Sequence, residues 1–228
     1  MEAPGGMISV VMPYWERSFA LAGALALFAL HYAEAKIEVV VVDDGSEDKP
    51  VLDTYPFPVR VLTLPRKPAP MNPCVPINRG VEAARGDVIV ITNPEILHKE
   101  PALPRMLDEL EALGANGYVL AAAWCPEQGQ WHCHSSRKHA EKVPQGAGYH
   151  FCAMLNRSLW DAAGGFDEGY RQGAGYDDPD WTWRLHRAGA KFKICDDIVV
   201  IHPKSGARTE WPMGGFERNR LLFESKWH

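Results

Sequence analysis

Residues 36–48 read KIEVVVVDDGSED, and this segment gives the clearest indication of the fold class. Its four consecutive valines, Val39 to Val42, form an apolar run without the alternation of a strand that has one face in water. Such a run is typical of a parallel strand that helices cover on both faces. The strand breaks at Asp43 and Asp44, which precede a Gly-Ser turn, so it brings two carboxylates to one edge of the predicted sheet.

Apolar strands and helix-forming segments alternate on both sides of this stretch, which predicts an α/β fold with an open, mostly parallel sheet flanked by helices. Two of the predicted helices end at glycines, Gly86 and Gly114. Besides the valine strand, the predicted elements up to residue 124 are strand 7–12, helix 19–33, strand 59–64, helix 78–86, strand 87–92, helix 101–113 and strand 118–124.

The regular pattern stops at the polar segment 125–148, and it then returns in a different form. A long irregular segment inside a compact domain is usually functional or mobile. The remaining sequence predicts a small antiparallel C-terminal portion, with a strand at 149–155, a helix at 176–189, and strands at 191–195 and 198–203.

The length of 228 residues suits one domain, 1–228, which buries roughly 70% of its unfolded surface. We expect a nucleotide-binding half at about 7–123 and an acceptor or catalytic half at about 124–205. The tail at 206–228 is rich in Gly, Arg and Trp, and we expect it either to close over the site or to fray.

Composition excludes some classes of partner. The net charge is −5, from 24 Lys and Arg against 29 Asp and Glu, and no basic block could follow a phosphate backbone, so we expect no nucleic acid. The start of the chain lacks the positive region of a secretory signal. The longest apolar run, 19–33, is shorter than the ~20 residues of a membrane span, which leaves only peripheral membrane contact open.

The cysteines indicate a reducing compartment. They number five and include no C-x-x-C pair, which is typical of free thiols in a cytoplasmic protein. Cys125, His132, Cys133 and His134 lie close in sequence, but their spacing matches no familiar zinc site.

Three predicted strand ends carry polar or aromatic groups, at 13–15 (PYW), 43–46 (DDGS) and 93–95 (NPE). In an open parallel sheet, ligands bind beyond the carboxyl ends of the strands, so these segments should meet at one crevice. Like charges gathered there need a cation or ligand donors to offset them.

Six segments, in this order, resemble the family-2 nucleotide-sugar glycosyltransferases of the GT-A fold, whose sheet is Rossmann-like. Each segment alone is a weak signal, but together they cover roughly residues 7–202. The segments are ISVVMPYWER, VVVVDDGSED, NRGVEAARGDVIVIT, GGFDEGY, YDDPDWTWRLHRAG and IVVIH.

The resemblance implies a donor site at the strand ends. Asp44 would accept a hydrogen bond from the base while Asp43 supports the turn, and Trp15 or Tyr14 would stack on the base. Asn78 would contact the ribose or the sugar. The implied nucleotide-binding set is Pro13, Tyr14, Trp15, Asp43, Asp44, Asn78, Asn93 and Gly165, and Arg66 and Lys67 are further candidates.

The metal site implied by the resemblance is altered here. Relatives carry Asp-x-Asp where this chain has Asn93-Pro94-Glu95, and many also carry an arginine where this chain has Ile77. Glu95 would hold Mn²⁺ or Mg²⁺ on the diphosphate, with His202 as a further ligand. We expect a weak metal site completed by the nucleotide, and a metal-free site stays open.

The acid group at 176–181, YDDPDW, carries the implied catalytic residues. By resemblance, Asp178 is the base that deprotonates the acceptor, Asp177 orients the acceptor, and Asp180 supports the helix. The alternative is that all three merely suit a helix N-terminus. Flat aromatic faces for a sugar ring would come from Trp124, Trp131 and Trp181, whereas Trp183 is expected to pack in the core.

Together these features predict a glycosyltransferase of the hexosyltransferase type. It would move a sugar from a nucleotide diphosphate, with a UDP-sugar as first candidate, to a hydroxyl of a saccharide or glycoconjugate. Asp178 as base implies inversion, and retention stays open. One alternative is a non-catalytic, degenerate sugar- or nucleotide-binding relative. Another is a sugar nucleotidyltransferase, but the segment MPYWERS lacks its Gly-rich phosphate loop.

Overall fold

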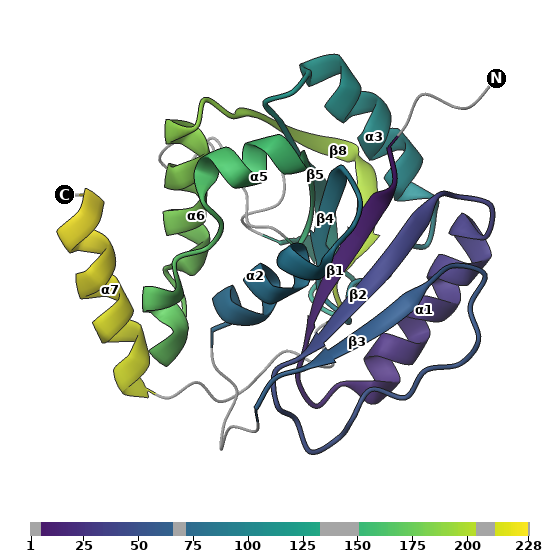
Figure 1. Cartoon of the computed structure of the whole chain (residues 1–228), viewed down its shortest axis with the longest axis horizontal. Coiled ribbons are helices and arrows are strands. Elements are labelled where there is room, and N and C mark those ends of the chain that lie inside the picture. Colours follow the sequence, from purple (N-terminus) through teal and green to yellow (C-terminus); the bar gives the residue numbers. More distant parts are fainter. Residues whose placement is uncertain (1–5, 66–71, 133–150, 204–212, 228) are drawn as a thin grey trace.

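A single mixed sheet forms the centre of the computed structural model, which describes residues 6–65, 72–132, 151–203 and 213–227 (Figure 1). Its strand order is β3-β2-β1-β4-β7-β5-β6, and β8 also pairs with β5. The strands are β1 (Ile8–Tyr14), β2 (Ile37–Asp43), β3 (Val59–Thr63), β4 (Val88–Thr92), β5 (Gly117–Cys125), β6 (Gln130–Trp131), β7 (Cys152–Asn156) and β8 (Lys191–Ile201).

The sheet is mostly parallel, as the valine run predicts. The pairs β1–β2, β1–β4, β2–β3 and β5–β8 are parallel, whereas β7 runs antiparallel between β4 and β5. Every residue of β2 and of β4 is buried. Continuous apolar strands therefore occupy the middle of the sheet, where both faces are covered.

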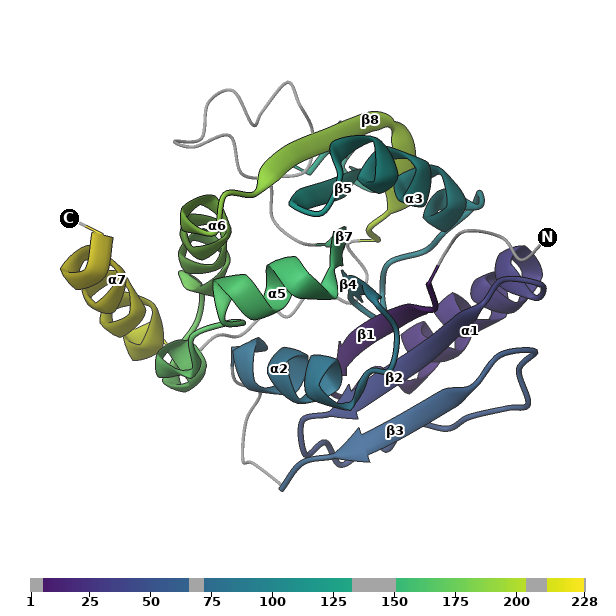
Figure 2. The ribbon, with the colours of Figure 1, turned by 45° about the horizontal axis from the view of Figure 1, so that its top comes forward.

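Helices cover both faces of the sheet (Figure 2). Val10 of β1 belongs to the core beneath α1 and α3, while its neighbour Val11 belongs to the core beneath α2, α5 and α6, because successive strand residues point to opposite faces. The helices are α1 (Ser18–Tyr32), α2 (Cys74–Ala83), α3 (Ala102–Leu113), α5 (Arg157–Ala163), α6 (Asp177–Arg187) and α7 (Met213–Trp227), with the 3₁₀ helix η2 (Glu168–Gln172). None of the helices in the described ranges is long and apolar enough to cross a membrane.

Two predicted boundaries are wrong. The segments 191–195 and 198–203 do not form separate strands, because a bulge in the β5–β8 register lets β8 continue past the exposed Asp196 and Asp197. Gly86 does not end a helix, since α2 stops at Ala83. A Cβ at Gly86 would lie 2.2 Å from the carbonyl oxygen of Met7, so glycine is needed there for close packing against the chain before β1.

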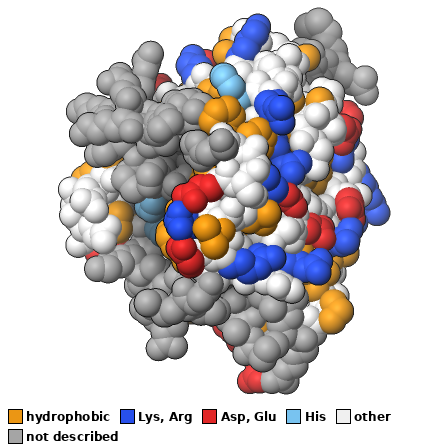
Figure 3. Space-filling view, turned by 90° about the vertical axis from the view of Figure 1, so that its left-hand side faces the viewer, with side chains coloured by type: hydrophobic (Ala, Val, Ile, Leu, Met, Phe, Trp, Pro, Cys, Tyr) orange, Lys and Arg blue, Asp and Glu red, His pale blue; other side chains and the backbone are white. Residues whose placement is uncertain are grey.

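The tail does not fray over residues 213–227, which form α7. This helix packs along the outer side of α6 and η2, at the end of the molecule far from β3 (Figure 1). Viewed from the α7 side, described basic side chains are interspersed with acidic and hydrophobic ones (Figure 3).

A buried polar network joins α1 to α3 and β7. The Tyr32 hydroxyl lies 2.7 Å from His98 Nδ1 and accepts a hydrogen bond from the backbone N–H of Ala102, at the start of α3. On the other side of the ring, Cys152 Sγ lies 3.6 Å from His98 Nε2. Burial, together with the nearby charge of His31, lowers the pKa of His98 to about 3. The imidazole is therefore neutral in the folded protein at neutral pH.

This network predicts acid sensitivity. An unfolded histidine takes up a proton near pH 6.5, whereas folded His98 does not until about pH 3. The contribution of neutral His98 to the free energy of unfolding is therefore complete above pH 6.5, and it is lost as the pH falls from 6.5 toward 3. We expect the free energy of unfolding to fall by up to about 1.4 kcal/mol per pH unit from this residue. Urea unfolding between pH 7 and pH 5 should show a shallower fall in His98→Gln than in the wild type or in His31→Gln. Equal slopes in all three would contradict this account.

Candidate active site

The carboxyl ends of the parallel strands and the first turn of α6 lie at one edge of the sheet. Helix α2 leads back into β4, so the N-terminus of α2 lies at the edge where β1, β2 and β4 end. Asn72, just before α2, donates from Nδ2 to the carbonyl oxygen of Gly175 over 3.4 Å. Burial raises the pKa of the Cys74 thiol, and the charge of Asp177 adds to this effect. The acid-bearing start of α6 is thus next to α2 at the predicted crevice.

The turn after β1 is fastened to the turn after β2. The carboxylate of Glu16 accepts hydrogen bonds from the backbone N–H groups of Glu47 and Asp48. In return, the Asp48 carboxylate accepts one from the N–H of Ser18 at 3.2 Å. Glu16 has a φ of 48°, a conformation that non-glycine residues seldom adopt and that these contacts hold in place. The residues on either side of Glu16 are therefore fixed relative to β2.

The two aromatic candidates at this turn differ in accessibility. Tyr14 is 1% exposed, and its hydroxyl donates to the carbonyl oxygen of Asp48 over 2.6 Å. Its ring is therefore buried and cannot stack on a base, so the prediction that Tyr14 could do so is wrong. Trp15 is only partly buried, so it is the aromatic residue of this pair that a base can reach. Pro13 lies within β1, opposite Val42 of β2.

At the end of β2, Asp43 holds the turn. Its Oδ1 accepts from the N–H of Gly45 at 3.1 Å and from the N–H and hydroxyl of Ser46, while Oδ2 accepts from Lys49 Nζ at 2.8 Å. Burial alone would raise the pKa of Asp43, but the hydrogen bonds from Lys49 and Ser46 lower it below its usual range. Asp44 is 3% exposed, and its contact with a base stays a prediction.

At the end of β4, the chain turns at Asn93-Pro94-Glu95. The N–H of Ile96 donates to the carbonyl oxygen of Asn93 over 3.1 Å, and proline suits the second position of such a turn. The turn directs Glu95 toward α1, where its Oε1 lies 3.8 Å from Nη1 of Arg17. The two side chains are only 12% and 16% exposed. The carboxylate predicted to hold a metal thus faces a guanidinium group.

The end of β8 lies beside the same turn. Leu97 and Ile201 exchange backbone hydrogen bonds at 2.9 Å in an isolated antiparallel bridge. This bridge brings the backbone of His202 close to that of Glu95, as the sequence predicts. The imidazole of His202 packs among rings, with centroids 5.0 Å from Phe151 and 5.5 Å from His132.

The side chains at this edge do not make up a metal centre built by the protein. No group of three or more His, Cys, Asp or Glu in the described ranges is arranged to hold a metal ion. Glu95 is ion-paired, and Asn93 contributes no charge. Glu95 and His202 would supply at most two ligands, and Glu95 already faces Arg17, so the donors that the protein itself offers fit a Mn²⁺ or Mg²⁺ site poorly. Arg66, Lys67, Cys133 and His134 lie outside the described residues.

The three acids of α6 have different surroundings. Asp177 is 5% exposed and Asp178 is partly buried. Burial raises the pKa of Tyr118 beneath the helix, and the charge of Asp178 adds to this, so Asp178 lies over the face of the sheet that α6 covers. Asp180 is fully buried. It accepts hydrogen bonds from Tyr170, Arg184, Lys226 and Trp227.

Asp180 thus joins α6 to α7, a contact that the sequence analysis missed. The only local signal was the spacing of charges on α7, where Arg220 pairs with Glu217 and Glu224 at helical intervals.

The glycine pair after α5 is held by Asn78. The Asn78 side chain donates to the carbonyl oxygen of Phe166 and accepts from its N–H, both at 2.9 Å. Gly164 and Gly165 have φ values of 78° and 67°, which favour glycine. Asn78 therefore anchors this loop beside α2, and its contact with ribose or sugar stays a prediction.

The tryptophans also differ in how far they are buried. Trp181 is fully buried and stacks on Phe166 at 4.8 Å, so it cannot face a sugar as expected. Trp183 stacks on Trp227 of α7 at 5.3 Å, which agrees with its expected packing role. Trp124 and Trp131 lie edge to face at the end of β5 and are partly exposed.

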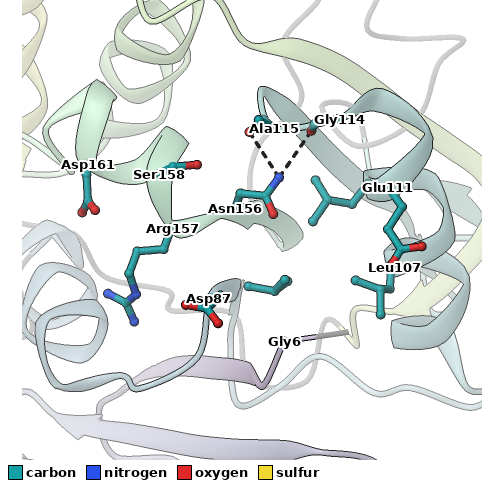
Figure 4. Close-up of a pocket in the computed structure, with 12 residues that line it drawn as sticks. Gly6, Asp87, Leu107, Glu111, Gly114, Ala115, Asn156, Arg157, Ser158 and Asp161 are labelled. Atoms are coloured by element: carbon teal, nitrogen blue, oxygen red, sulfur yellow. Dashed lines mark hydrogen bonds between the residues drawn. The ribbon is translucent and has the colours of Figure 1, made fainter. Parts of the chain in front are cut away.

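A cavity of about 670 Å³ lies at the opposite edge of the sheet, where β1, β4 and β5 begin (Figure 4). Asp87, Glu111 and Asp161 line it. Its polar groups serve the fold: Asn156 Nδ2 donates to the carbonyl oxygens of Gly114 and Ala115, as the dashed lines show. This cavity is therefore separate from the predicted donor site.

The chain belongs to the family described as Glycosyl transferase family 2, which its residues 9–162 match. No curated protein matches the sequence. The fold is that of the GT-A glycosyltransferases, as the similar solved structures show.

One such structure is the mannosyltransferase PcManGT from Pyrobaculum calidifontis in complex with GDP-Man and Mn²⁺, with a TM-score of 0.65 and 18% identity over 90% of this chain. Another is S. aureus TarS 1-349 in complex with UDP, with a TM-score of 0.71 and 14% identity over 96% of this chain. This chain covers 59% of the PcManGT chain and 65% of the TarS chain.

Proposed function

We propose that this protein transfers a sugar from a nucleotide diphosphate donor, with a UDP-sugar as first candidate, to a hydroxyl of a saccharide or glycoconjugate. The observation that carries the proposal is the position of Asp177 and Asp178 next to the N-terminus of α2, at the edge where β1, β2 and β4 end. Donor and acceptor groups can therefore meet at one crevice. The hexosyltransferase class follows from this reading.

The donor half comprises about 7–123, where the turns after β1 and β2 are fastened together. Trp15 stacks on the base and Asp44 accepts a hydrogen bond from it. The PcManGT structure contains GDP-Man and the TarS structure contains UDP, so the base is the first property to be tested.

The catalytic half comprises about 124–205 and includes α6. Asp178 takes the proton of the acceptor hydroxyl as it attacks the anomeric carbon, and the sugar leaves the diphosphate with inversion. Asp177, in the same first turn, orients the acceptor. General-base catalysis of this kind is worth ~10² to 10⁴ in rate, and stabilisation of the charge that develops on the diphosphate adds to it.

A binding protein without turnover is the second candidate. The turn at Asn93-Pro94-Glu95 has one carboxylate, and this carboxylate is paired with Arg17. This pairing favours a protein that binds the nucleotide sugar without transferring it. Binding of a nucleotide sugar without release of the nucleotide would support it.

The test is calorimetric titration with UDP and GDP, followed by assay of nucleotide release from UDP- and GDP-sugars. We expect Trp15→Ala to weaken binding of the preferred nucleotide by about 5- to 150-fold, because base stacking is worth ~1–3 kcal/mol. Phe19→Ala is the matched control, since Phe19 is 93% exposed on the neighbouring helix turn. Binding of neither nucleotide by the wild type would refute the proposed function.

A further inference from the structure

We propose that Arg17 binds the diphosphate of the donor and supplies the positive charge that a protein-bound divalent cation would otherwise provide. This inference rests on the proposed function. It follows from the disagreement between the residues at the end of β4 and the metal that the fold family implies. Glu95 faces Nη1 of Arg17 at 3.8 Å, and the described residues contain no group of three or more His, Cys, Asp or Glu arranged for a metal ion.

The Arg17 guanidinium has unused donor capacity. Its Nη1 atom is buried and makes no hydrogen bond to any described residue, although its side chain keeps 16% of its surface exposed. A buried N–H group without a partner is unfavourable unless a ligand or water accepts from it. Phosphate oxygens are suitable acceptors, because the planar guanidinium can donate two parallel hydrogen bonds to them and stays charged at any physiological pH.

The backbone around Arg17 is held before any ligand binds. Arg17 lies between Glu16, whose carboxylate accepts from the N–H groups of Glu47 and Asp48, and Ser18, whose N–H donates to Asp48. Arg17 is also the N-cap of α1, whose 15 residues point their positive end toward the same turn, where the Asp48 carboxylate accepts from the N–H of Ser18. The guanidinium is thus carried by a fixed segment at the predicted donor crevice.

In this proposal Glu95 acts on Arg17 and does not bind a metal ion. Its carboxylate orients the guanidinium and offsets part of its charge while no donor is bound. A cation placed on Glu95 would have to displace Arg17 or lie against a like charge. A diphosphate placed beside Arg17 meets an opposite charge instead. Glu95 is therefore a positioning residue, and Arg17 touches the substrate.

The test compares nucleotides with nucleosides, using UDP against uridine and GDP against guanosine, in EDTA and in Mn²⁺. We expect the wild type to bind the preferred diphosphate in EDTA within about 3-fold of its affinity in Mn²⁺. Arg17→Ala should weaken diphosphate binding about 10- to 100-fold in EDTA and leave nucleoside binding unchanged, because the lost hydrogen bonds are charge-assisted. Arg17→Lys should recover part of the lost affinity, since lysine keeps the positive charge but lacks the planar guanidinium that donates two parallel hydrogen bonds.

Arg79→Ala is the matched control, because Arg79 pairs with Glu82 on the surface of α2 and is 46% exposed. It should bind like the wild type. Diphosphate binding that needs Mn²⁺, or that is unchanged in both Arg17 variants, would overturn this inference and leave the proposed function intact. Absence of binding by any nucleotide or nucleoside would overturn both.

Discussion

Asp178→Asn is expected to reduce sugar transfer by ~10² to 10⁴ while nucleotide affinity stays within a few-fold of the wild type. Asparagine has nearly the same shape as aspartate but cannot accept the acceptor's proton. Asp178 is partly buried at the start of α6, and none of its expected contacts is to the nucleotide. Transfer would be measured with a saturating donor and a panel of saccharide acceptors, and affinity by titration with the bare nucleotide.

The neighbouring acid provides the control. Asp177→Asn, one residue earlier and 5% exposed, should raise the KM for the acceptor more than it lowers kcat, because it positions the acceptor and takes no proton. Transfer by Asp178→Asn at the wild-type rate would remove Asp178 as base. Loss of nucleotide binding in that variant would instead indicate that the residue supports the donor site.

The fold could be predicted because its signals are local. The valines of β2 and the apolar run of β4 show burial on both faces in the sequence itself, and acids or turn residues mark where the strands end. Strand ends in a parallel sheet meet at one edge, so the convergence of Asp43, Asp44 and Glu95 follows from the strand order. The bulge in β8 could not be foreseen, because it depends on pairing with Ala121 and Ala122 of β5.

The details of the site depend on contacts between residues that are distant in sequence. Arg17 and Glu95 are 78 positions apart, and nothing near either residue indicates that they form a pair. Tyr14 and Trp181 both lie in motifs of the site, yet packing of the whole chain buries them. Aromatic residues beside a functional motif serve the core as readily as a ligand, and the sequence does not distinguish these two uses.

The position of helix α7 likewise depends on contacts with residues that are distant in sequence. A Cβ at Gly173 would lie 2.3 Å from the carbonyl oxygen of Gly215, so the two segments approach through glycines that read locally as flexible loop. Asn219 secures the approach by donating to the carbonyl oxygens of Tyr170 and Gly175. Helix α7 is therefore positioned by its partner surface rather than by its own composition.

Asp180→Ala is expected to lower the free energy of unfolding by about 3 kcal/mol, the largest stability effect that we predict for a single side chain in this region. The change removes the acceptor shared by Tyr170, Arg184, Lys226 and Trp227, all of which donate to this buried carboxylate. Because a buried ion pair is costly to break on one side only, the loss should exceed the value of any one of these hydrogen bonds. Urea unfolding at pH 7 measures it.

Two further variants separate the charge of Asp180 from its link to α7. Asp180→Asn keeps the shape and some acceptor capacity but loses the charge, so it should be destabilised less than Asp180→Ala. Glu217→Ala, which breaks a surface ion pair on α7, should change the free energy of unfolding by less than about 0.5 kcal/mol. If Asp180 joins α6 to α7, the effects of Asp180→Ala and Trp227→Phe should be less than additive in the double variant, because both remove the same contact. Strict additivity would mean that the 2.9 Å contact between Trp227 Nε1 and Asp180 contributes nothing to holding α7.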